Sequence, residues 1–225
     1  MTDSNSPRIF PMSSEPFGMS YEDWTIKFWQ WLISIPADRS PVTDETGERA
    51  GVAQIGQPIF NLVFSSKGEV QREYTVPAGQ HILIPVNVVE TSFTEFPGAK
   101  DDDDLRKLAK EDESSNPFVF LSVDGKKFNE LESTDGNQLA DLKEFRVHSR
   151  PFDVTFPDNP IFGFPGRSRA VSDGFWVILE ALTIGTHHIN FAARLTNPIT
   201  DRLFYSDNVK YTIHVLEDKT EGLSA

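Results

Sequence analysis

The chain has 225 residues, no cysteine and a formal net charge of −13 at pH 7. The absence of cysteine excludes disulfides, thiolate metal sites and cysteine nucleophiles. The negative charge disfavours nucleic acids and anionic membranes as partners, because their phosphate groups repel such a surface.

No apolar run approaches the roughly 20 residues of a membrane span. The first residues lack the apolar segment of a signal peptide. We therefore expect a cytoplasmic protein by default, and secretion stays open if a leader was trimmed away.

An aromatic helix is predicted over residues 21–35, which hold three of the chain's four tryptophans. Ser20 is the expected N-cap, and Pro36 ends the helix because the residue before a proline avoids helical geometry. A helix this apolar must dock on another layer. If Trp31 is fully buried there, Trp31→Ala should lower the free energy of unfolding by roughly 3–5 kcal/mol.

Short β-strands are predicted for most of the rest of the chain. They are 59–64, 70–76, 81–89, 118–123, 126–128, 139–147, 152–156, 174–183, 187–195 and 209–216. Pro85 inside one of them predicts an edge strand or a bulge, and Asp124-Gly125 predicts a hairpin turn. Residues 101–110 begin with four aspartates, which suit the N-terminus of a short helix.

This order of elements predicts a mainly β protein. We expect an antiparallel two-sheet sandwich, of the jelly-roll or immunoglobulin-like kind, with the aromatic helix and the short acidic-start helix packed on it. Residues 1–19 are predicted to be an irregular arm, residues 20–217 a single domain and residues 218–225 a frayed tail.

Six segments of the sequence carry a family pattern, and they are YEDWTIKFWQWLISIP, VPAGQHILIPV, LRKLAK, VDGKK, FRVHS and SDGFWVILEALTIGTHHINF. Together they resemble a family of uncharacterised bacterial and archaeal proteins. Members of the family carry a W-x-x-x-W-W-Q-W-x-x-S-I-P segment, a P-A-G-K-x-I-L-F-P segment and a later S-D-G-Y-W-V-x-L…G-x-H-x-I-x-F hairpin. The resemblance implies a shared architecture and assigns no chemistry. Some relatives resemble secreted proteins with cysteines, from which this chain departs.

Metal binding has two candidates, His187 and His214, which would meet if their strands pair in the same register. The alternative is that His187 packs beside the turn at Gly185. The carboxylates of Asp101 to Asp104 match Ca²⁺ in type, but consecutive residues at a helix start splay apart, which favours a solvated helix N-terminus. We expect no cofactor.

Acid–base chemistry has four candidates. They are Glu90, Arg146, Asp173 and His148. A buried carboxylate beside an arginine suits catalysis because both burial and charge shift its pKa, and the alternative is a structural ion pair. No G-x-S-x-G elbow and no glycine-rich phosphate loop occurs in the sequence.

Aromatic residues are candidates for stacking on a sugar or an apolar ligand. They are Trp29, Trp176, Phe162 and Phe164. The alternative is core packing, the usual place of aromatic side chains in a sandwich.

Three functions remain open from the sequence. The first is a non-catalytic module that binds a small molecule, a glycan or a protein. The second is an enzyme with a polar site between helix and sheet that uses Glu90, Arg146, Asp173 or His148. The third is a structural protein that self-associates into a homo-oligomer through the tryptophan helix.

Overall fold

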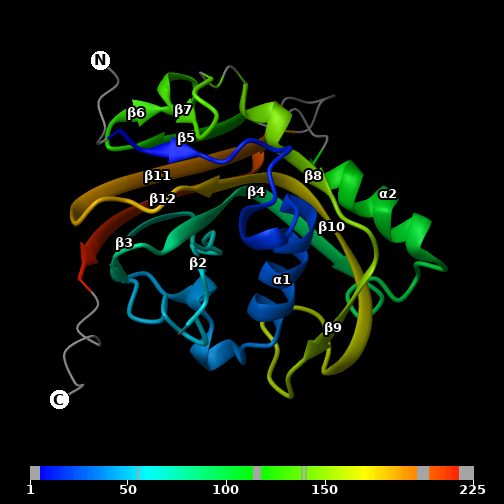
Figure 1. Ribbon diagram of the computed structural model, residues 1–225. Helices are drawn as coiled ribbons and strands as arrows, with labels where there is room; N and C mark the ends of the chain where they lie inside the picture. Colours follow the sequence, from blue (N-terminus) through cyan, green and yellow to red (C-terminus); the bar gives the residue numbers. More distant parts are fainter. Residues whose placement is uncertain are drawn as a thin grey trace.

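The computed structural model describes residues 6–54, 56–113, 118–137, 139, 141–196 and 203–217. Two β-sheets pack together through one hydrophobic core that extends from Ile9 to Val215 (Figure 1). The predicted sandwich with added helices is therefore confirmed. The helices are α1 (Tyr21–Ile33) and α2 (Asp102–Glu113). Neither is long and apolar enough to cross a membrane.

The strands divide between the two sheets by pairing. They are β1 (Arg8–Ile9), β2 (Ile59–Asn61), β3 (Glu69–Pro77), β4 (His81–Ser92), β5 (Phe118–Val123), β6 (Lys126–Lys127), β7 (Glu132–Ser133), β8 (Arg146–His148), β9 (Phe152–Phe156), β10 (Gly166–Leu179), β11 (Gly185–Thr196) and β12 (Leu203–Leu216). One sheet has the order β2-β4-β10-β1-β7, with β8 and β9 also paired to β10, and the other has the order β3-β12-β11-β5-β6.

The sheets are mixed, which corrects the purely antiparallel prediction. β2 pairs with β4, β3 with β12 and β1 with β7 in parallel. The parallel pairing of β2 with β4 has a simple cause. Between these two strands the chain crosses to the other sheet, forms β3 there and crosses back, and such a connection permits parallel pairing.

Pro85 lies in β4, which pairs with β2 on one side and β10 on the other. The prediction of an edge strand is therefore wrong, and the alternative prediction of a bulge is correct. The register of β10 shifts between Phe175 and Trp176, beside the pair Trp176–Pro85. A bulge accommodates a residue that has no N–H to give to the ladder. The predicted hairpin at Asp124-Gly125 joins β5 to β6 as expected.

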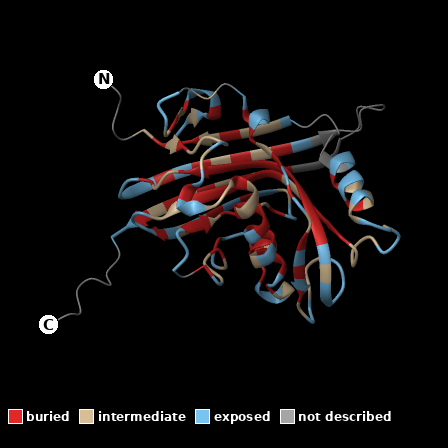
Figure 2. Ribbon diagram, turned by 45° about the vertical axis from the view of Figure 1, so that its right-hand side comes forward, coloured by how far each residue is buried: buried red, intermediate tan, exposed pale blue. Residues whose placement is uncertain are grey.

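The aromatic helix α1 packs into the core, as Figure 2 shows by its buried inner surface. The ring of Phe28 meets Trp176 of β10 edge-on, with 4.9 Å between centroids. Trp24, Trp29 and Leu32 are buried, whereas Trp31 is only half-buried. The condition for the large Trp31→Ala effect is therefore not met.

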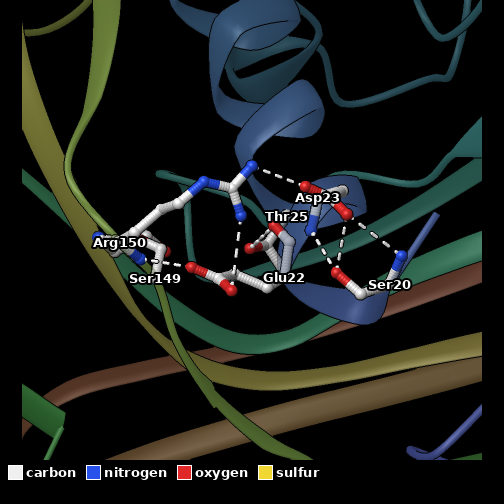
Figure 3. Close-up of polar contacts among 7 residues, drawn as sticks. Ser20, Glu22, Asp23, Thr25, Ser149 and Arg150 are labelled. Carbon is white, nitrogen blue, oxygen red and sulfur yellow. Dashed lines mark hydrogen bonds and ion pairs between the residues drawn. The ribbon is translucent and has the colours of Figure 1, made fainter.

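Polar contacts fix the N-terminus of α1 (Figure 3). Ser20 and Asp23 form the expected cap, in which each side chain bonds the backbone N–H of the other. Arg150 reaches both acidic residues of the first turn, with Nη1 3.3 Å from Glu22 and Nη2 2.5 Å from Asp23. This arginine ties the helix start to the segment that follows β8.

Acid should weaken this contact. The hydrogen bond from Arg150 is the main cause that lowers the pKa of Asp23 below its ordinary value. A depressed pKa in the folded state contributes stability above the unfolded pKa of about 3.9, and the contribution disappears as pH falls through the folded pKa. We expect Arg150→Gln to lower the Tm at pH 7, and the difference from the wild type to shrink below about pH 4. Calorimetry from pH 2 to 8 measures this, and a gap constant with pH would contradict it.

The two ends of the chain were predicted to be irregular. Within the described residues, Arg8–Ile9 instead forms β1, because Ile9 is buried and pairs with Leu179. The predicted tail 218–225 lies outside the described residues.

Candidate functional site

Three of the four acid–base candidates meet at one point, on β8 and β10. Asp173 stands directly opposite His148 in the register, and Arg146 lies opposite Phe175. Side chains two positions apart along a strand share a face. Arg146 and His148 therefore both reach the carboxylate of Asp173.

The carboxylate of Asp173 is 4% exposed and fully engaged. Arg146 binds it in a fork, with Nε 2.8 Å from Oδ1 and Nη2 2.9 Å from Oδ2. Nδ1 of His148 lies 2.9 Å from Oδ2. Bidentate pairs of this kind are strong and orient both partners. Asp173 thus acts as an anchor that holds a cation and an imidazole at the surface.

A pocket of about 350 Å³ opens beside this cluster, between α2 and the segment 146–149. Its lining residues are Arg106, Ala109, Lys110, Arg146, His148, Ser149, Val171, Ser172 and Asp173. Figure 1 shows α2 running along β10 at this place. Leu105 and Ala109 of the helix pack against Val171 of the strand, and Thr91 bonds the carbonyl of Leu105 at 3.0 Å.

Glu90, the fourth candidate, lies on the other face of the sheet. It stands opposite Ser172, whose hydroxyl accepts a hydrogen bond from Trp29 of α1, so it belongs to the α1 side. Glu90 therefore does not share a site with the other three candidates of the enzyme hypothesis, because neighbouring strand positions alternate faces. Burial, followed by the charge of Glu95, raises the pKa of Glu90 well above its ordinary value.

The aromatic candidates divide between core and surface. Trp29 and Trp176 are buried against Phe28 and each other, so a ligand cannot stack on them. Phe162 is half-buried against the core. Phe164 is 66% exposed in the loop before β10.

The two histidines considered for a metal lie on opposite faces. His187 pairs with Ile213, and His214 pairs with Thr186, so the register separates them. His187 contacts Asp124 and the carbonyl of Thr183, while His214 contacts Glu73. Within the described ranges, no group of three or more His, Cys, Asp or Glu residues could hold a metal ion.

The four aspartates at the start of α2 act as the sequence predicts. Asp101 accepts hydrogen bonds from the N–H groups of Asp103 and Asp104, at 3.1 and 3.0 Å. Asp102 binds Arg169 at 2.9 Å. They cap and anchor the helix, consistent with favourable placement of carboxylates at a helix N-terminus.

Two pocket residues, Arg106 and Lys110, were not foreseen. The sequence does contain a signal for them: Arg106 and Lys110 are four residues apart, so on a helix both cations lie on one face, with Ala109 between them. The sequence alone does not tell which strand that face meets.

No protein-family model matches the sequence, and no curated protein matches it. The family resemblance described above therefore stays a prediction. Two solved structures show a weak similarity. The crystal structure of EhICP2, a cysteine protease inhibitor from Entamoeba histolytica, is 14% identical, covers 69% of this chain and 94% of that chain, and has a TM-score of 0.21. The solution structure of Amebosin is 11% identical, covers 65% and 96%, and has a TM-score of 0.19. Similarities this low carry no argument about this protein.

Proposed function

We propose that the protein is a non-catalytic binding module whose pocket beside α2 takes a small anionic ligand with an apolar body. One observation supports this most directly. The lining holds three permanent cations, Arg106, Lys110 and Arg146, and one carboxylate, Asp173. Asp103, outside the lining, pairs with Arg106 at 2.7 Å, so one positive charge is in excess. The whole chain carries −13, so the lining differs in sign from the net charge of the chain.

The chemistry of the pocket fits such a ligand. Ala109 and Val171 supply an apolar wall, and Arg106 and Lys110 approach from one helix face. Pockets of this type bind by apolar contact and use a few polar groups to fix orientation. A carboxylate, phosphate or sulfonate group would lie among the cations, with an aliphatic or aromatic body against the wall.

The proposal is tested by calorimetric titration with phenyl phosphate and benzoate, and with neutral benzyl alcohol for comparison. We expect the anions to bind more weakly as salt rises. Loss of one cation contact should weaken binding about tenfold, which corresponds to about 1.4 kcal/mol. Arg106→Gln and Lys110→Gln should each show this loss.

Lys107→Gln is the matched control, because Lys107 lies on the same helix but lines a different depression. It should leave the affinity unchanged. Equal binding of benzyl alcohol, equal loss in the Lys107 variant, or no binding of either anion at 10 mM would contradict the proposal.

The second candidate function is an enzyme, and the pair His148–Asp173 favours it, because a carboxylate that orients an imidazole is half of an acid–base device. In the described part of the chain, no hydroxyl group hydrogen-bonds Nε2 of His148, so the nucleophile would have to be water or the substrate. Turnover of phenyl phosphate or a phenyl ester that disappears in His148→Gln, with binding retained, would establish the enzyme and replace the binding module.

Self-association through the tryptophans of α1 has less support. The exposed residues of this helix are polar, namely Lys27 and Gln30, and of its tryptophans Trp24 and Trp29 are buried while Trp31 is half-buried. Light scattering at high concentration tests the oligomeric state, and a monomer would exclude this function.

A further inference from the structure

Four oxygen-bearing side chains gather where β4 ends. Glu90 and Ser92 lie on one face of the strand because they are two residues apart. The chain then turns sharply, with the N–H groups of Glu95 and Phe96 donating to the carbonyl of Ser92 at 3.2 and 2.9 Å. This turn brings Thr94 and Glu95 back beside Ser92.

The oxygens of this cluster lie within hydrogen-bond distance of one another. The hydroxyl of Ser92 is 2.6 Å from Oε2 of Glu95 and 3.2 Å from the hydroxyl of Thr94. Glu90 lies two residues before Ser92 on the same face of β4, so its carboxyl group belongs to the same cluster. Two neighbouring carboxylates repel each other, and a positive charge between them offsets this repulsion.

Glu90 carries an unsatisfied atom. Glu90 is 7% exposed, and Oε1 of its carboxyl group is buried with no hydrogen-bond partner among the described residues. A buried acceptor without a partner costs free energy. A bound cation would satisfy this oxygen and neutralise the repulsion between the two glutamates.

We propose that Glu90, Ser92, Thr94 and Glu95 form a binding site for a hard divalent cation, with Ca²⁺ preferred. All donors are oxygens, which suits Ca²⁺ and Mg²⁺ and disfavours thiophilic metals. Ca²⁺ accepts six to eight oxygens in flexible arrangements, and water can complete the shell. With two carboxylates, the site has moderate affinity.

The surroundings provide both access and enclosure. Glu95 also lines a depression of about 480 Å³ beside α2, so this member of the cluster reaches the surface. On another side the loop before β10 closes over the cluster. A Cβ added at Gly163 would lie 3.0 Å from Cγ of Glu95 and 3.1 Å from the hydroxyl of Thr94.

The test uses the metal alone, CaCl₂ or MgCl₂, and measures the Tm of the full chain at pH 7.5. We expect 10 mM CaCl₂ to raise the Tm by about 3 °C, as ligand linkage predicts for a millimolar site in a chain of this size. MgCl₂ should give a smaller rise. Glu90→Gln and Glu95→Gln should remove the response to CaCl₂.

A second measurement locates the cation independently of stability. Tb³⁺ replaces Ca²⁺ in oxygen sites and emits when a nearby tryptophan is excited. Trp29 bonds Ser172, which stands opposite Glu90, so sensitised emission is expected. CaCl₂ should quench it, and Glu90→Gln should abolish it.

Asp103→Asn is the control for unspecific attraction to the acidic surface, because Asp103 is 88% exposed at the start of α2. It should retain both responses. The proposal is overturned if CaCl₂ leaves the Tm of the wild type unchanged, which would mean that the glutamates share only a proton. It is equally overturned if Glu90→Gln retains the response, since the cation then binds elsewhere.

Discussion

Trp176→Ala is expected to lower the free energy of unfolding by about 3–5 kcal/mol. Trp176 is completely buried on β10 and contacts both Phe28 and Trp29 of α1. Removing the indole therefore leaves a cavity at the contact between helix and sheet, where little can move to fill it. Urea unfolding followed by far-UV circular dichroism measures the loss.

Two controls separate this packing effect from other causes. Nε1 of Trp176 has no hydrogen-bond partner among the described residues, so Trp176→Phe sacrifices no bond and should cost no more than about 2 kcal/mol. Trp31 is half-buried and bonds the carbonyl of Val52, so Trp31→Ala should cost less than Trp176→Ala. An equal or larger loss in Trp31→Ala would show that the core is centred elsewhere.

Arg72→Met is expected to have an effect of similar size, about 3–5 kcal/mol. Arg72 is buried on β3, and its guanidinium donates to the carbonyls of Val42, Asp44, Val63 and Phe64 and to the hydroxyl of Tyr211. These carbonyls belong to the irregular chain before and after β2. Removing the donors leaves several buried acceptors unpaired.

The matched control is Arg169→Met, which removes an exposed arginine paired with Asp102 and should change stability by less than about 1 kcal/mol. Amide hydrogen exchange gives a second readout. In Arg72→Met the protection of residues 42–64 should fall first. If both arginine variants had the same small effect, the buried guanidinium would not organise this segment.

The helix α1 shows how far the sequence allows prediction. Its capping residue and its aromatic face can be predicted from the sequence, because helix capping and hydrophobic periodicity are local properties. Its buried side can be predicted only in part: Trp31 is a candidate for full burial and Trp29 a candidate for ligand stacking in the sequence, whereas Trp29 is the more buried of the two in the structure. The covering segments around Val52 and Phe64 decide this, and they approach only in the folded chain.

Strand register likewise decides which of the candidate residues lie together. Asp173, Arg146 and His148 were selected by residue type, and the pairing of β8 with β10 brings them together. The same alternation of faces separates Glu90 from Asp173 and His187 from His214. Strand pairing between residues far apart in the chain has no local signal, so sequence patterns name such residues without placing them.

The pairing of Ile9 with Leu179, and of β3 with β12, has a consequence for folding during synthesis on the ribosome. In one sheet, β1 lacks its antiparallel partner β10 until Leu179 has been synthesised. In the other sheet, β3 lacks its partner β12 until the chain has been synthesised as far as Leu216. Contacts this distant along the chain slow folding. The nascent polypeptide therefore emerges from the ribosome with its tryptophan-rich helix still uncovered, and its second sheet is complete only after Leu216 has been synthesised.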